Sequence, residues 1–228
     1  MSQEIQLPPD DLIRRTRGDV AFVVNFSGGK DSMRMLGRVR ELYPNDPIFV
    51  VMADTGFEHG RPISAEDWSR EQVARLALPL SVVRNPNKTY LQMVERRGMF
   101  PSSTTRQCTS DLKRGPIEKF VRALSQKVIV NCTGIRSEES SQRSKQIPWK
   151  ANKSLSVAGR SVWDWMPIFD ESLGKVLSWH WCWLQCYAAT LQSYAATRRR
   201  HRCKAVPATR FTGIPPPVSD DFRQSARS

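Results

Sequence analysis

Several features are scarce or absent in this 228-residue chain, and each absence excludes a class of protein. No run approaches the roughly 18 consecutive apolar residues that span a bilayer, which argues against a membrane protein. The chain has no C-x-x-C pair, and its three histidines complete no zinc-ligand spacing, so we expect neither a metal site nor an iron–sulfur cluster. Residues 1–18 contain no apolar segment of the kind that directs secretion, which predicts a cytoplasmic protein.

The composition that remains is that of a globular protein. Hydrophobic residues make up 39% of the chain and aromatic residues 9%, enough for a sizeable core. The length corresponds to one full domain and part of a second. The five cysteines are odd in number, and in a reducing compartment we expect them to be free thiols.

The positive charge is concentrated at one end of the chain. The formal net charge is +13, and residues 175–228 contribute +7 of it, with nine basic residues, two acidic residues and no glutamate. We therefore predict three parts: an N-terminal extension over 1–18, an α/β domain over 19–174 and an atypical basic tail over 175–228. The abrupt change suggests the hypothesis that the tail arose by a frameshift or a replaced end. A genuine tail would suit a nucleic-acid backbone.

Strand-like and helix-like segments alternate through the first two-thirds of the chain. Short apolar runs predict buried strands over 20–26, 48–53, 80–83 and 128–131. Apolar residues at helical spacing, with capping signals, predict helices ending near Tyr43, over 64–76, from Thr89 through Arg97 and from Pro116 onward. This alternation predicts right-handed crossovers and a Rossmann-like, doubly wound parallel sheet that binds ligands at the carboxyl ends of its strands. A helix over 176–194 is also compatible with the sequence.

The turn between the first strand and its helix has the residues of a phosphate-binding loop. It reads Ser27-Gly28-Gly29-Lys30-Asp31-Ser32. Glycines let backbone N–H groups approach an anion at a helix N-terminus, while the lysine supplies charge and the serines supply hydroxyl donors. The loop is neither a Walker A motif, because Asp31 follows the lysine, nor a GxGxxG turn. The alternative is a glycine-rich turn with a serine cap.

Four segments, in order, resemble the phosphoadenosine phosphosulfate (PAPS) reductase family of the PP-loop adenine-nucleotide α-hydrolases, with its phage and DNA-sulfur-modification relatives. They are the SGGxDS string at 27–32, the DTGxE-like turn at 54–58, the C(C/T)xxxKxxP-like stretch at 106–116 and G-x-R-x-x-E-S-x-x-R at 134–143. The resemblance spans about residues 20–170. It implies a PP-loop ATP pyrophosphatase-type fold and an adenine-nucleotide-binding domain over 19–174.

The resemblance also implies site residues. Phosphates would lie on Ser27, Gly28, Gly29, Lys30, Asp31 and Ser32, and the nucleoside near Asp54 and Thr55. Gly134, in the same crevice, would also bind the nucleotide. Sulfate or further phosphate would be bound by Arg106, Lys113, Arg136 and Arg143, since arginine offers planar, forked donors. Cys108 is the candidate catalytic thiol, because neighbouring basic residues stabilise a thiolate.

Each of these assignments has a structural alternative. Asp54 would instead cap a helix, and Arg106 and Lys113 would be ordinary surface residues. Glu138, Glu139 and Arg143 would form a solvated charge pattern, and Cys108 would be a small buried apolar residue.

The resemblance weakens toward the C-terminus. Trp163–Asp170 is similar to the family's aromatic-Pro-Ile segment, whose aromatics either join the core or stack on adenine. Glu171 then stands where the family has Trp, and Lys175 where it has Asp. A Glu-Cys-Gly-Leu-His-like element, which carries the nucleophilic cysteine of true PAPS reductases, is absent from the sequence.

The functional prediction is a protein that binds ATP or PAPS and acts in sulfur transfer or sulfonucleotide reduction, with a thiol reductant protein as a partner. Two alternatives remain open: an ATP pyrophosphatase that adenylates a nucleic acid or base, and an inactive protein that binds nucleotide or DNA. Mg²⁺ would be needed if ATP is hydrolysed.

Overall fold

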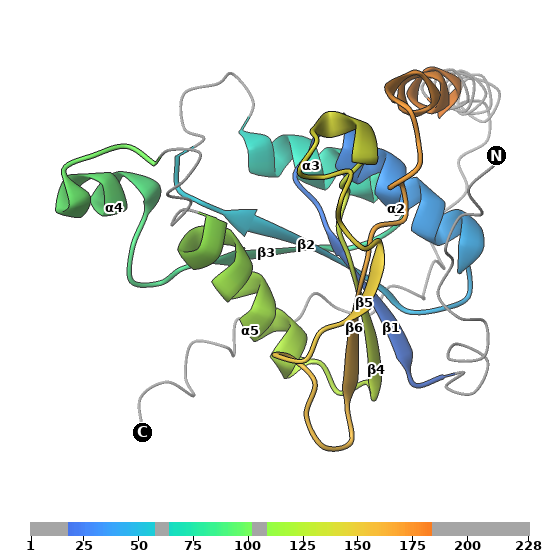
Figure 1. Ribbon diagram of the computed structural model, residues 1–228, viewed down its shortest axis with the longest axis horizontal. Helices are drawn as coiled ribbons and strands as arrows, with labels where there is room; N and C mark the ends of the chain where they lie inside the picture. The colour runs from blue at the N-terminus through green and yellow to red at the C-terminus, as the bar shows by residue number, and fades with distance from the viewer. Residues whose placement is uncertain (1–17, 58–63, 102–108, 184–228) are drawn as a thin grey trace, which may run out of the picture. The chain divides into compact units, whose positions relative to one another are not determined.

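A single six-stranded sheet organises the part of the chain that the structure describes, residues 18–57, 64–101 and 109–183 of a computed structural model (Figure 1). The strand order is β3-β2-β1-β4-β6-β5. All neighbouring strands are parallel except β5, which runs antiparallel to β6. The bounds are β1 Val20–Asn25, β2 Ile48–Asp54, β3 Leu80–Arg84, β4 Val128–Cys132, β5 Trp149–Ala151 and β6 Ser161–Trp165. The predicted α/β class and mostly parallel sheet are confirmed.

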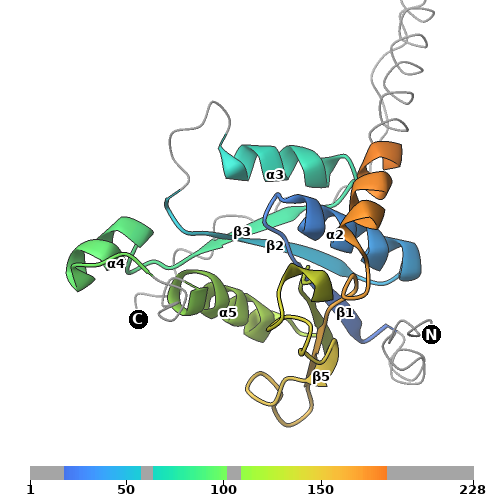
Figure 2. The same cartoon turned by 45° about the horizontal axis from the view of Figure 1, so that its top comes forward.

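The central strand β1 reads as a continuous apolar run because both of its faces are covered. Phe22 and Val24 pack toward α2 (Lys30–Leu42) and α3 (Ala65–Ala74), while Val23 packs toward α5 (Gly115–Ala123). Figures 1 and 2 show α2 and α3 on one side of the sheet and α5 on the other. This three-layer arrangement leaves the carboxyl ends of the strands available for a ligand.

The capping residues predicted from the sequence lie at the ends of helices in the structure. Ser64 caps α3 by accepting a hydrogen bond from the backbone N–H of Asp67. Thr89 begins α4 (Tyr90–Arg97) with a reciprocal capping box, and Gly98 ends it in the left-handed conformation. Proline occupies the first turn of α5, as expected from its missing N–H. A π-helical turn η1 (Thr109–Arg114) leads directly into α5.

The sheet extends further than the sequence predicted. Neither β5 nor β6 was expected, although the apolar–aromatic segment at 163–165 belongs to β6. A short 3₁₀ turn, η2 (Ser137–Glu139), lies between β4 and β5. Strand β5 is a three-residue edge strand, and an antiparallel neighbour needs no crossover helix. No helical pattern therefore separates β5 from β6 in the sequence, so the alternation of strands and helices did not reveal this pair.

The chain continues after β6 into a helical segment, residues 173–183, that packs on α2. Val176 is fully buried, and the Trp179 ring lies only 2.3 Å from where a Cβ on Gly37 would be. The rest of the predicted 176–194 helix lies outside the described residues. The boundary at residue 175 stays a prediction. In the described ranges, none of the helices has the length and apolar content needed to cross a membrane.

Candidate functional site

The candidate site lies where the strand order reverses, between β1 and β4. Successive strands β1, β2 and β3 proceed toward one edge, and the chain then returns to place β4 on the opposite side of β1. Loops that leave two adjacent parallel strands in opposite directions create a crevice at their carboxyl ends. The loop Ser27–Ser32 follows β1, and Gly134 follows β4, so both lie at this crevice.

The loop Ser27–Ser32 closes on itself and leaves the N-terminus of α2 without a side-chain cap. The Ser32 hydroxyl donates to the carbonyl of Gly29 at 2.8 Å, and the Ser27 hydroxyl lies 3.2 Å from that of Ser32. Gly29 is the N-cap residue and makes no side-chain capping bond. The first helical hydrogen bond runs from the N–H of Met33 to Gly29, at 3.0 Å. The N–H groups before it are available to an anion.

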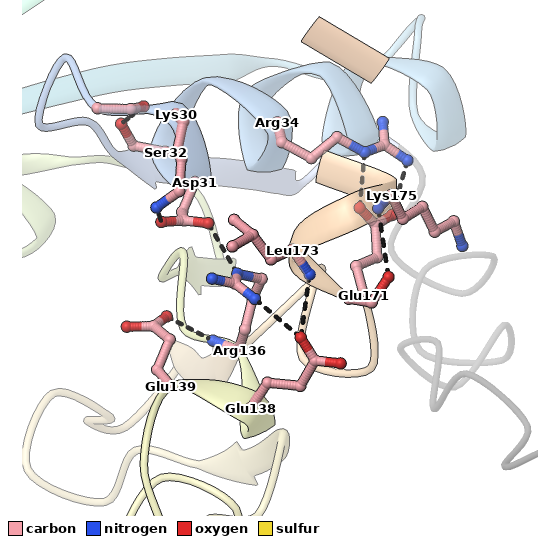
Figure 3. Close-up of polar contacts among 12 residues, drawn as sticks. Lys30, Asp31, Ser32, Arg34, Arg136, Glu138, Glu139, Glu171, Leu173 and Lys175 are labelled. Carbon is pink, nitrogen blue, oxygen red and sulfur yellow. Dashed lines mark hydrogen bonds and ion pairs between the residues drawn. The ribbon is translucent and has the colours of Figure 1, made fainter. Parts of the chain in front are cut away.

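An arginine from the loop after β4 holds this helix start (Figure 3). Arg136 is buried, and its Nε donates to Asp31 Oδ1 at 2.8 Å. A Cβ on Gly134 would lie 3.2 Å from the backbone of Asp31, so the two loops are in close backbone contact. The structure therefore brings Gly134 and Arg136 to the loop Ser27–Ser32. Their role in binding stays a prediction.

Two glutamates and a second arginine extend this cluster. Arg136 Nη1 lies 3.4 Å from Glu138 Oε2, and that oxygen also accepts the backbone N–H of Leu173 at 3.0 Å (Figure 3). Glu139 accepts the backbone N–H of Arg136 at 2.9 Å and forms an ion pair with Arg143. Arg143 thus pairs with a neighbouring carboxylate. This pairing is compatible with the alternative in which Glu138, Glu139 and Arg143 form a solvated charge pattern.

The charged groups around Asp31 change the pKa of its carboxyl group. Burial of the carboxyl raises its pKa, but hydrogen bonds and charge from Lys30, at 2.8 Å, and from Arg136 outweigh burial and lower the pKa below its ordinary value. The ionised form is therefore the one that the fold stabilises.

We expect Asp31→Asn to destabilise the protein at neutral pH and to have less effect in acid. A carboxyl with a lowered pKa contributes stability that is complete above its unfolded pKa of roughly 4 and is lost as the pH falls through the folded pKa. Urea unfolding of both proteins between about pH 3 and 7 measures this. A constant difference across that range would contradict the assigned ion pair. The exposed Asp170 provides a control variant, Asp170→Asn.

The carboxyl end of β2 and the turn after it line a neighbouring cavity. Asp54 accepts the backbone N–H of Gly56 at 2.8 Å and pairs with Arg84 at 3.1 Å, so it stabilises a turn. The backbone carbonyl of Thr55 accepts the N–H of Tyr90 at 3.0 Å. A cavity of about 150 Å³ opens here, lined by Met52, Ala53, Asp54, Thr55, Ser64, Ala65, Glu66 and Arg84. Both residues assigned to the nucleoside therefore line a cavity at the carboxyl end of β2.

The segment between α4 and α5 is described only in part. Arg106 and Cys108 lie outside the described residues. Lys113 lies exposed in η1, whose Asp111 accepts a hydrogen bond from Asn85 after β3 at 3.0 Å. Within the described ranges, no His, Cys, Asp and Glu side chains gather in threes that could hold a metal ion.

Three contacts to the loop and to α2 were not predicted. Trp68 of α3 donates from Nε1 to the carbonyl oxygen of Gly28, and His180 contacts the carbonyl oxygen of Lys30. Glu171, which the sequence marked only as a departure from the family, forms a buried ion pair with Arg34 of α2 (Figure 3). The linear sequence contains no local signal for pairs separated by 40 residues or more.

Comparison with known families gives one match that covers most of the chain. Residues 21–185 match the phosphoadenosine phosphosulfate reductase domain. The match therefore includes the loop Ser27–Ser32, the crevice and helical segment 173–183.

The curated relatives are longer than this chain. It is 27% identical over 173 residues to an uncharacterized 37.8 kDa protein of Escherichia phage 186, a match that covers 56% of this chain and 51% of the phage protein. An uncharacterized protein of Methanocaldococcus jannaschii is 30% identical over 122 residues, which cover 53% of this chain and 24% of that one. The chain thus spans about half or less of these relatives.

Among solved structures, the PAPS reductase of Candida auris, in a phosphate complex, matches with a TM-score of 0.47 and 14% identity. The match covers 76% of this chain and 78% of that one.

Proposed function

Because the chain belongs to the phosphoadenosine phosphosulfate reductase domain family, we propose that the loop Ser27–Ser32 binds the phosphates of an adenine nucleotide, ATP or PAPS. The observation that carries this proposal is the uncapped start of α2 at the strand-order reversal. There the N–H groups before Met33 make no helical hydrogen bond. Orphan N–H groups and the positive end of a helix dipole together favour phosphate.

The surrounding residues take distinct parts in this proposal. Lys30, with 45% of its side chain exposed, is free to turn from Asp31 toward a phosphate oxygen. Arg136 holds Asp31 and the start of α2, and presents charge beside the loop. Asp54 and Thr55 line the cavity that would receive the nucleoside. Arg106, Lys113 and Arg143 would bind the remaining anionic groups of the substrate.

For the reaction, we propose sulfur transfer or sulfonucleotide reduction with a thiol reductant protein, and Cys108 as the candidate thiol. The buried Cys132 is a poor alternative, because burial, followed by the charge of Asp164, raises its thiol pKa well above the ordinary value. ATP pyrophosphatase chemistry on a nucleic acid is the second candidate, favoured by the +7 charge of residues 175–228. In that case Mg²⁺ would be held chiefly by the ATP phosphates.

Lys30→Ala is expected to weaken binding of ATP or PAPS by about tenfold or more, because it removes a charge-assisted contact to phosphate. Isothermal titration calorimetry with ATP, PAPS and adenosine 3′,5′-bisphosphate measures the change. Lys127→Ala is the matched control, since Lys127 pairs with Asp19 on the surface. Equal affinity in the Lys30 variant, or no binding by the wild-type protein, would exclude the phosphate-loop assignment.

The products separate the two reactions. PAPS reduction by the thiols of the reductant protein yields adenosine 3′,5′-bisphosphate, sulfite and a disulfide, whereas adenylation of an acceptor releases pyrophosphate from ATP. Chromatography of the nucleotides after incubation with ATP or PAPS identifies the products. Pyrophosphate formation that depends on added nucleic acid would favour the second candidate and contradict the first.

A further inference from the structure

Two ring N–H groups from different elements contact the peptide carbonyls of the phosphate loop. Trp68 of α3 donates from Nε1 to the carbonyl oxygen of Gly28, at 3.1 Å. His180 of helical segment 173–183 lies with Nε2 2.8 Å from the carbonyl oxygen of Lys30. A carbonyl oxygen can only accept, so the proton in the second contact belongs to His180 Nε2. The loop is therefore contacted at two alternate peptide units.

We propose that Trp68 and His180 are positioning residues that turn the N–H groups of Gly29 and Asp31 toward the bound phosphate. In a trans peptide, the C=O of one residue and the N–H of the next point in opposite directions. Drawing the Gly28 carbonyl toward α3 therefore turns the Gly29 N–H away from α3. In the same way, the His180 contact holds the Lys30 carbonyl at the first position of α2 and keeps the Asp31 N–H directed away from residues 173–183.

Both N–H groups are available for a ligand. Among the described residues, no acceptor is paired with the N–H of Gly29. Asp31 lies in the first turn of α2, before Met33 makes the first helical hydrogen bond, so its N–H also lacks a helical acceptor. Fixing such donors before a ligand arrives reduces the entropic cost of binding.

Both rings project from elements that are firmly packed beside the loop. Ser69, next to Trp68, is fully buried, and its Oγ lies 2.7 Å from where a Cβ on Gly28 would be. Trp68 itself is 42% exposed, so its ring contributes little to the hydrophobic core.

The helical segment that carries His180 is anchored to α2 at two levels. Val176 is fully buried, and Trp179 lies against Gly37 and donates from Nε1 to Glu41 at 3.0 Å. The helix that contacts Lys30 is therefore packed against α2. His180 lies beyond residue 175, where the composition of the chain changes. We infer that residues as far as His180 take part in building the phosphate site.

This inference rests on the proposed function, and its test uses the full chain with ligands that differ in phosphate content. Trp68→Phe removes the N–H and retains an aromatic ring, and His180→Leu removes the second donor. Each is expected to weaken ATP and PAPS binding about fivefold, the effect of one neutral hydrogen bond, and to leave adenosine binding unchanged. His180→Gln retains an N–H donor and should restore most of the affinity. Trp181→Phe, on the exposed face of the same helix, is the matched control.

Calorimetry with ATP, PAPS and adenosine decides the outcome. Selective loss of phosphate-bearing ligands, with rescue by His180→Gln and no change in Trp181→Phe, supports the positioning role. Wild-type affinity in both Trp68→Phe and His180→Leu overturns it while leaving the phosphate loop intact. Equal losses for adenosine and ATP also overturn it, because they indicate general disruption. Absence of ATP and PAPS binding by the wild-type protein overturns both proposals.

Discussion

Glu171→Leu is expected to lower the free energy of unfolding by about 3 kcal/mol, because it leaves a buried guanidinium without its main partner. Arg34 and Glu171 form a two-point ion pair, with Nε–Oε2 at 2.8 Å and Nη2–Oε1 at 2.7 Å. Their side chains are only 5% and 6% exposed. Burial lowers the pKa of Arg34, but the hydrogen bonds and charge of Glu171 outweigh burial and raise it. Arg34 therefore stays charged and requires the partner.

Urea unfolding of Glu171→Leu, Arg34→Met and the double variant tests this coupling. Replacing both members of a buried ion pair by apolar residues is often close to neutral, so the double variant should be more stable than either single variant. Asp170→Asn, at the exposed neighbouring position, should change stability by less than about 0.5 kcal/mol. Losses that simply add in the double variant would show that the two residues do not act as a pair.

Gly28→Ala is expected to destabilise the protein by about 3 kcal/mol and to weaken nucleotide binding by about tenfold or more, since strain and a clash act together. Gly28 has φ +74°, in the left-handed region that L-residues avoid. An added Cβ would also lie 2.7 Å from Ser69 Oγ and 3.3 Å from the Trp68 ring. Relieving either contact requires the loop or α3 to move.

Two controls separate strain from clash. Gly159 has φ +82° and nothing within 4 Å of the added Cβ, so Gly159→Ala should show only the conformational cost of about 1 to 2 kcal/mol. Ser69 Oγ has no hydrogen-bond partner among the described residues, so Ser69→Ala alone should cost little. Combined with Gly28→Ala, it should recover part of the lost stability. Equal losses in Gly28→Ala and Gly159→Ala would argue against the close approach of α3.

The loop and its setting were predictable because their determinants are local. A buried apolar strand, a glycine pair and a helix start follow one another between Val20 and Tyr43. The capping residues Ser64 and Thr89 likewise act on N–H groups three residues away. Such signals are present in any short window of the chain.

Residues assigned by motif were harder to interpret, because a motif gives positions and not partners. The sequence predicted that Arg136 and Arg143 would bind anions. The structure pairs Arg136 with Asp31 and Glu138, and Arg143 with Glu139. Their contribution to ligand binding stays a prediction, and the contacts show that each also takes part in the scaffold of the site.

The sequence by itself determined the α/β class, the glycine-rich loop after the first strand and the family resemblance, because periodicity and short motifs are properties of neighbouring residues. Only the tertiary structure decided what surrounds the loop. Trp68, His180 and Glu171 act on residues 40, 150 and 137 positions away, and no local pattern encodes such contacts. The same holds for the charges. The net charge of +13 follows from the sequence, but the ion-pair partners of Arg34 and Arg136 depend on tertiary packing.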